Sequence, residues 1–150
     1  MGIEYRLTLS VPSPVTEVAR RAVGDPGVPL TPYEHLLTAD LNTSHGYSLS
    51  VGPVLDAYFE AVGDAGLQSW EVAKGVSITY AVTSDATWRA RAQQNILISV
   101  AGVLATGPED VTLIHNHDYL ILTRVGGVVH KFRRDTWWAG VPQADAIIPG

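Results

Sequence analysis

Three histidines and an aspartate near the C-terminus have residue types and a spacing that suggest a reaction site. His115, His117 and Asp118 lie close together in the chain, and His130 follows on what we expect to be a nearby strand. Imidazole nitrogens and carboxylate oxygens are zinc ligands, so a metal-assisted hydrolase is one interpretation. The same residues also fit a hairpin turn around Asn116, since Asn and Asp tolerate turn geometry and bond their own backbone. We expect the turn and keep the hydrolase as the alternative.

Other catalytic patterns lack the local sequence that would support them. Ser44-His45 and Ser84-Asp85 can be combined on paper with His115 into a hydrolytic triad, but neither serine lies in a nucleophile elbow. Gly126-Gly127 is not a phosphate-binding loop, because no helix follows it. The chain has no cysteine, which excludes disulfides, thiolate metal sites and cysteine nucleophiles. We therefore expect no catalytic residue, no bound metal and no cofactor.

Acidic and basic residues are separated along the chain. The net charge is −5, and the stretch from Ala22 to Ala73 contains seven carboxylates and no Lys or Arg. The C-terminal segment is basic instead, with cations at Arg124, Lys131, Arg133 and Arg134. A block of one sign can steer a partner of the opposite sign. The acidic block is therefore either a surface for a basic partner or an ordinary solvated surface.

The basic segment ends at Trp137-Trp138, and such a mixture of cations and aromatic rings also occurs on nucleic-acid-binding surfaces. Phosphate binding usually needs a broad positive face, whereas this chain is acidic as a whole. We therefore expect no nucleic-acid partner. One of the two tryptophans should seal the edge of the core, with Arg133 or Arg134 packed along it.

Length and composition fit one domain. Apolar residues make up 46% of the 150-residue chain and charged residues 17%, which suits a folded domain with a sizeable core. We expect a single α+β domain over residues 1–138 and a loose tail over residues 139–150. The longest apolar-rich run, Asn95 to Ala105, is shorter than the roughly 20 residues that span a bilayer, and no basic leader precedes an apolar run. We expect a cytoplasmic protein that does not bind a membrane.

Period-two and helical patterns give the elements of the first two thirds. Residues 3–9 and 47–51 alternate as half-buried strands do, and so do residues 76–82. Ser13 and Pro14 should begin a helix that ends at Gly24, and the proline-rich residues 24–35 should be a loop. Residues 53–62 segregate apolar from acidic side chains best as a helix. Asp85 should cap the longest helix, which continues to Ala105.

Three β-type runs joined by two turns form an antiparallel meander at the C-terminal end. The runs are residues 111–114, 119–125 and 128–132, and the chain reverses at residues 116–118 and at Gly126-Gly127. Together with the earlier elements they predict an α+β fold. We expect an antiparallel sheet of about six strands, with two or three helices mainly on one face and the other face partly open.

Several short motifs occur in a characteristic order, at Glu4-Tyr5-Arg6-Leu7, Gly107-Pro108-Glu109-Asp110, Asn116-His117-Asp118, Leu120-Ile121-Leu122-Thr123-Arg124 and Arg133-Arg134-Asp135-Thr136-Trp137-Trp138. In this order the chain resembles the bacterial immunity proteins of the swarm-inhibition toxin (Sit-type) family. The resemblance covers the first strand and the C-terminal part of the chain. It does not extend to residues 36–71, and His117 stands where that family usually has Gly.

The resemblance implies a cytoplasmic, non-enzymatic protein that protects its producer and kin by binding a cognate toxin from neighbouring cells. Such a protein would serve contact-dependent competition and kin discrimination. The surface that recognises the toxin is expected to vary within the family, which is consistent with the unmatched middle of the chain. A protein-interaction module that binds no toxin is a further alternative, and a homodimer stays open.

The acidic block is the predicted toxin-binding surface. Its carboxylates could occupy the Lys and Arg groups with which a nuclease toxin holds phosphate, and its aromatic residues would add buried contact area. The predicted toxin-binding residues are Glu34, Asp40, Asp56, Tyr58, Phe59, Glu60 and Asp64.

Overall fold

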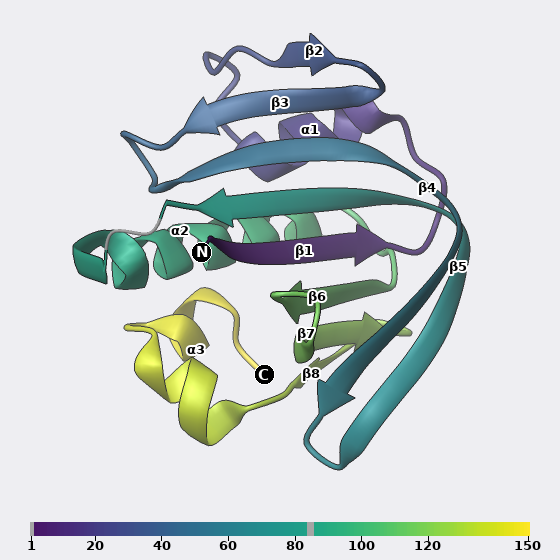
Figure 1. Ribbon diagram of the computed structural model, residues 1–150, viewed down its shortest axis with the longest axis vertical. Coiled ribbons are helices and arrows are strands. Elements are labelled where there is room, and N and C mark those ends of the chain that lie inside the picture. Colours follow the sequence, from purple (N-terminus) through teal and green to yellow (C-terminus); the bar gives the residue numbers. More distant parts are fainter. Residues whose placement is uncertain (1, 84–85) are drawn as a thin grey trace.

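Alternating apolar residues near the N-terminus form β1 (Ile3–Leu9), which lies inside an antiparallel sheet. The computed structural model describes residues 2–83 and 86–150, and it shows an α+β fold with helices against one face of an eight-stranded sheet (Figure 1). The strand order is β2-β3-β4-β5-β1-β6-β7-β8. The other strands are β2 (Thr31–Tyr33), β3 (Leu36–Leu41), β4 (Tyr47–Gly63), β5 (Gly66–Val82), β6 (Val111–His115), β7 (Tyr119–Val125) and β8 (Val128–Lys131).

The fold class was predicted correctly, but the sheet has eight strands in place of about six. The two additional strands are β2 and β3, and β2 lies inside the segment expected to be loop. All three residues of β2 are exposed, and Pro32 cannot donate a backbone hydrogen bond. This edge strand forms because it pairs with β3, and its own sequence gives little indication of a strand.

The predicted helix over residues 53–62 is wrong, because this segment is part of β4. Every described pair across the β4–β5 hairpin keeps one register, from Tyr47 opposite Val82 to Gly63 opposite Gly66. The apolar residues that seemed to share a helix face are divided between the two faces of the strand. The segment is a strand because it pairs with β5, which follows it in the chain. Local periodicity cannot reveal such a partner.

The main core lies between the sheet and two helices, α1 (Val15–Val23) and α2 (Ala86–Ala105). The sheet contributes three fully buried tyrosine side chains, of which Tyr80 hydrogen-bonds Ser99 of α2 at 2.7 Å. Trp137 Nε1 donates to the Tyr5 hydroxyl at 3.0 Å. Burial raises the pKa of Tyr47 to about 12 and also raises that of Tyr80. All three phenols are therefore neutral members of the core at physiological pH.

The predicted α2 helix is confirmed, although Asp85, its expected cap, lies outside the described residues, as does Ser84. α1 also forms as expected, but Pro14 occupies its N-cap position and no side chain caps it, so the role expected of Ser13 is wrong. Pro14 already has the extended backbone that precedes a helix. Among the described residues, no helix is long and apolar enough to cross a membrane.

Two arginines, the buried Arg124 and the partly buried Arg21, hold the end of α2. Arg124 of β7 donates to the backbone carbonyls of Leu104, Gly107 and Glu109 at 2.7–3.0 Å, and only 8% of its surface is exposed. Arg21 of α1 binds both carboxylate oxygens of Glu109 at 2.7 and 2.9 Å. The hydrogen bond from Arg21 holds the pKa of Glu109 below its ordinary value. Both arginines therefore serve the scaffold, since their donors bind groups within the protein.

The segment expected to be a loose tail, residues 139–150, packs on the core instead. It contains the short helix α3 (Ala144–Ile147), and its Val141, Ala144 and Ile148 are buried. The ammonium of Lys131 on β8 has no exposure, since it binds Asp145 Oδ1 at 2.7 Å and lies 4.5 Å from the Trp138 ring centre. Both tryptophans of the π-helical turn Arg134–Trp138 are buried as well. The low number of charged residues in this segment therefore goes with its packing on the core and not with disorder.

Candidate functional site

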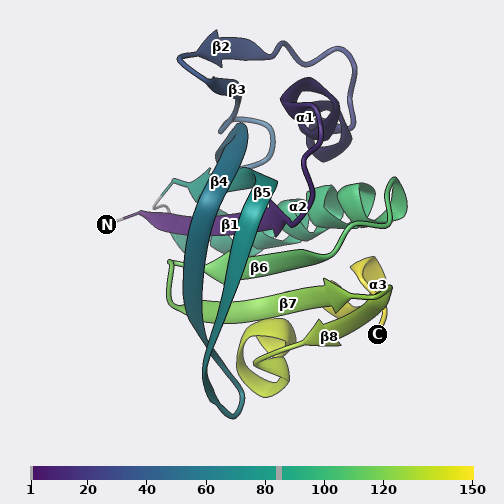
Figure 2. The ribbon, with the colours of Figure 1, turned by 90° about the vertical axis from the view of Figure 1, so that its right-hand side faces the viewer.

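The outer half of the β4–β5 hairpin, residues 56–73, is called the arm. The hairpin bends where Asp56 has a left-handed φ of 47° and cross-strand pairing is interrupted opposite Ala73. Near the bend, a side chain at Gly75 would collide with the backbone carbonyl of Leu9, so glycine permits this close approach. Beyond the bend the arm crosses β6 and β7 on the face opposite the helices (Figure 2).

A small second core and two backbone contacts hold the arm on the sheet. Val62 N donates to the carbonyl of Asp118 at 2.7 Å, and Asp64 Oδ1 accepts a hydrogen bond from Arg133 N at 2.9 Å. Under the arm, Phe59 stacks on Trp70 with ring centres 5.6 Å apart. These rings pack on a cluster of buried side chains, Ala61, Ile114, Leu120 and Phe132. The arm is therefore attached along its length while its outer surface faces solvent.

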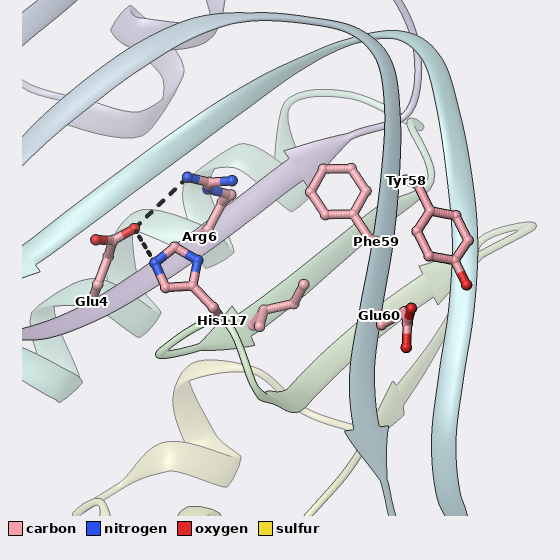
Figure 3. A pocket seen from close by; sticks show the side chains of 7 residues that line it. Glu4, Arg6, Tyr58, Phe59, Glu60 and His117 are labelled. Atoms are coloured by element: carbon pink, nitrogen blue, oxygen red, sulfur yellow. Dashed lines mark ion pairs between the residues drawn. The ribbon is translucent and has the colours of Figure 1, made fainter.

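A pocket of about 240 Å³ lies between the arm and the sheet, as Figure 3 shows. In it, Glu4 Oε1 lies 3.4 Å from His117 Nε2 and 3.8 Å from Arg6 Nη2. All three side chains are partly exposed. The pocket thus combines aromatic surface with a carboxylate that a guanidinium and an imidazole flank loosely, and its lining residues are Glu4, Arg6, Tyr58, Phe59, Glu60, Ile114 and His117.

A second hollow, of about 450 Å³, lies at the base of the arm between its two strands. Asp56, Tyr58 and Glu71 line it, and Tyr58 is paired with Glu71 across the hairpin. The Tyr58 side chain is 59% exposed, and Glu60, next on the same face, is exposed as well. The arm itself carries no Lys or Arg. Its outer surface is therefore acidic and aromatic, which suits contact with a basic partner.

The structure divides the seven predicted toxin-binding residues among four places. Tyr58, Phe59 and Glu60 share the pocket under the arm, and Asp56 lies at the bend. Asp64 lies at the tip, where its carboxylate already binds Arg133 N. The remaining two are far along the sheet, since Glu34 is in the β2–β3 turn with a φ of 54° and Asp40 accepts from Asn42 N at 3.1 Å. As toxin contacts, all seven stay a prediction.

The candidate metal ligands are not brought together. His115 stacks on the buried Tyr5 with ring centres 4.7 Å apart, whereas His117 faces Glu4 on the opposite side of the sheet. His130 packs on Phe132 at 4.5 Å. Burial, together with the charge of Arg133, lowers the pKa of His115. Within residues 2–83 and 86–150, no group of three His, Asp or Glu side chains is placed to hold a metal.

The expected turns between the last strands are confirmed. Asn116 and His117 have left-handed φ values of 49° and 64°, and Gly126 and Gly127 have φ values of 57° and 82°. Asn116 also ties the first turn to β1, since its backbone N–H donates to the carbonyl of Glu4 and its side-chain oxygen accepts from Glu4 N, both at 2.8 Å. The Asn-His-Asp step is therefore a structural turn.

Sequence reasoning missed Glu4 and Arg6 as parts of the pocket. Both lie on β1 and alternate with the buried Tyr5 and Leu7, so the period-two pattern already assigned them to the face away from the core. Nothing in the sequence indicated that the arm would fold across that face. The alternation in β1 therefore indicates that Glu4 and Arg6 face away from the core, but it does not indicate that they face the arm.

Comparison with known proteins identifies a family. Searches of curated proteins and of solved structures gave no match. A protein-family model described as SitI3-like matches residues 3–142, which include the sheet, both long helices and the arm. The match supports the resemblance noted in the first strand and in the C-terminal motifs. The chain belongs to the SitI3-like family, of the Sit-type immunity proteins.

Proposed function

We propose that this chain is an immunity protein that binds and neutralises a cognate antibacterial toxin in the cytoplasm of the producer or kin cell. Membership in the SitI3-like family suggests the immunity function. The observation that carries the binding mode is the acidic, aromatic arm, which extends from the bend across the sheet with its outer face exposed. The protein acts by occupying a surface of the toxin, so it needs no catalytic residue.

Charge supports a toxin with a basic active site, such as a nuclease. Asp56, Glu60 and Glu71 are exposed on the arm, and no cation of the arm neutralises them. A nuclease gathers Lys and Arg to hold phosphate, so carboxylates on a protruding arm can occupy the same groups. This complementarity would speed association and would weaken as salt concentration rises.

Aromatic anchoring supports the same surface. Tyr58 is 59% exposed at the middle of the arm, and Tyr is a residue that often dominates protein interfaces. Phe59 is half-buried against Trp70, so it holds the strand in place while Tyr58 points outward. The arm therefore offers one exposed aromatic side chain within an acidic surface.

The metal-assisted hydrolase is less well supported. The sheet separates His115 from His117, and the arrangement of His117 beside Glu4 and Arg6 is that of a loose ion-pair cluster. An interaction module that binds no toxin predicts the same fold as an immunity protein. Only a functional assay separates those two.

The test is co-expression of the chain with the product of the adjacent reading frame, followed by a binding measurement on the purified pair. The wild type should rescue growth and form a stable complex. The double variant Glu60→Lys, Glu71→Lys should weaken that complex by about a hundredfold or more at low salt, since it places cations against cations. Asp64 is left unchanged, because its carboxylate tethers the arm to Arg133.

The matched control is the double variant Glu17→Lys, Asp25→Lys, which changes the net charge equally at two exposed sites in α1 and just after it, away from the arm. It should bind within about threefold of the wild type, as remote surface changes usually do. Equal losses of affinity in both double variants would mean that the arm acts only through net charge and is not a contact surface. Absence of toxicity and of a complex with the wild type would reject the proposed function.

A further inference from the structure

The sheet face opposite the helices carries small hydroxyl side chains over β1, β3, β4 and β5. Cross-strand pairing aligns them in rows, so that Thr38 lies opposite Ser50, Ser50 opposite Thr79, and Thr79 opposite Arg6. The adjacent row pairs Ser77 with Thr8, whose hydroxyls are 2.8 Å apart. This area is called the hydroxyl face. Its small side chains leave a depressed surface beside the overhanging arm.

Three hollows on this side of the sheet are neighbours. Two of them, of about 330 and 170 Å³, both include Ser50 and Thr79 in their lining. The smaller of these shares Arg6 with the pocket under the arm. The three hollows together, from Asp40 on β3 to the pocket beneath the arm, are called the trough.

Charge in the trough favours a basic occupant. Among the described side chains that line it, the carboxylates are Glu4, Asp40 and Glu60, and the guanidinium is that of Arg6. Glu4 accepts no hydrogen bond of ordinary length from Arg6 or His117, which lie 3.8 and 3.4 Å away. Its carboxylate can thus take a stronger donor from a partner.

The polar atoms of the trough also fit a polypeptide. Ser48, Ser50, Ser77 and Thr79 are among the residues that line it. Backbone carbonyls and amides can pair with Ser and Thr hydroxyls, which adapt to either role.

We infer that this trough is the second wall of the toxin interface, in which one protruding, Lys- or Arg-bearing segment of the toxin lies between the hydroxyl face and the arm. The inference rests on the proposed function and specifies its geometry. The arm contributes acidic and aromatic contacts from one side, and Glu4 with the hydroxyl rows contributes contacts from below. Binding therefore buries surface on the open face of the sheet as well as on the arm.

Thiol protection tests this geometry directly. The native chain has no cysteine, so the Ser50→Cys variant contains a single thiol at the middle of the trough. The Ile98→Cys variant is the control, because Ile98 is 56% exposed on α2 on the helix side. Alkylation by iodoacetamide, followed by the intact mass of each chain, should slow by about tenfold or more at the Ser50→Cys thiol when the toxin is bound. The control thiol should react at an unchanged rate.

A filled trough gives an independent measurement. Thr79→Trp places a large ring where two hollows meet and should weaken the toxin complex by about a hundredfold, whereas Ile98→Trp should leave it intact. Circular dichroism and a thermal melt establish that each variant is folded. If Thr79→Trp does not fold, the thiol measurement decides alone.

The outcomes separate the two proposals. If the wild type fails to bind the toxin, the proposed function fails before any variant is examined. If the wild type binds and the Ser50→Cys thiol reacts equally fast in the complex, the trough is not part of the interface and only the arm is. Loss of binding in Glu60→Lys, Glu71→Lys together with an unprotected Ser50→Cys thiol would confirm the proposed function and overturn this inference.

Discussion

The two halves of the β4–β5 hairpin share one register but lie in different surroundings. In the inner half, Leu49, Val51, Ile78 and Tyr80 are buried against the helices. In the outer half, the arm, the buried side chains are few, and they rest on a small cluster around Ile114. The bend at Asp56 marks the change. Beyond the bend, the strand pair is therefore held by its backbone pairing and by the small cluster, and not by the core that stabilises its base.

This difference separates the residues that specify the fold from those free to specify a partner. Each inner residue faces either the helices or the hydroxyl face. Each outer residue faces either a small cluster or solvent, so several positions can change charge without disturbing the main core. The arginine contacts at the end of α2 belong with the inner half in this respect, since Arg21 and Arg124 bind groups of the scaffold.

The largest expected effect compares one core residue from each half. Ile78→Ala removes a fully buried side chain and should lower the free energy of unfolding by about 2–5 kcal/mol. Phe59→Ala removes a half-buried side chain from the arm and should cost about 1 kcal/mol. Urea unfolding monitored by circular dichroism measures both. Equal costs would mean that the arm contributes to stability as much as the main core does.

A smaller effect, dependent on pH, should be confined to the scaffold. The pKa of Glu109 is lowered in the folded state, so its ion pair with Arg21 stabilises the protein above the ordinary pKa of 4.5 and loses that contribution as pH falls through the lowered value. Glu109→Gln should therefore cost about 1–3 kcal/mol at pH 7, and the difference from the wild type should narrow in acid. Unfolding curves across pH 3–7 test the trend, which a constant difference would refute.

The smallest effect concerns the attachment of the arm. Asp64→Ala removes the acceptor of Arg133 N at the tip and should lower global stability by only about 0.5–1.5 kcal/mol. Hydrogen exchange should show a larger change, with faster exchange at Arg133 N and Val62 N and little change at Ile78 N. Uniform acceleration throughout the sheet would contradict the view that the arm opens independently of the inner half.

Much of the fold could be predicted from the sequence because many elements follow local patterns. β1 alternates as a strand does, the three C-terminal strands are short runs rich in β-branched residues and Leu, and the turn at Gly126-Gly127 has the residues that such a turn needs. The arm could not be predicted in this way. Its side-chain types do not alternate, since the aromatic Tyr58 and Phe59 are neighbours although one is exposed and the other half-buried, and its strand state depends on a partner that follows the tip.

The candidate site was predicted only in part for a related reason. The carboxylates were recognised by their number, but a charge pattern does not say which residues meet in space. The structure places Glu60 in the lining of the same pocket as Glu4 and Arg6, and Asp64 accepts a hydrogen bond from a backbone N–H. Burial of the tail was missed as well, because the contact between Lys131 and Asp145 links a strand to a short helix that has little pattern of its own.

The unbroken register of the hairpin has a consequence for how such proteins can diversify. Tyr47 pairs with Val82 at the base and Gly63 with Gly66 at the tip, and the bend does not shift the pairing. Inserting one residue in each strand near the tip lengthens the arm while every core side chain keeps its orientation. The reach of the arm is therefore a property that evolution or engineering can adjust separately from its charge, so that one scaffold can match partners with binding sites of different depth.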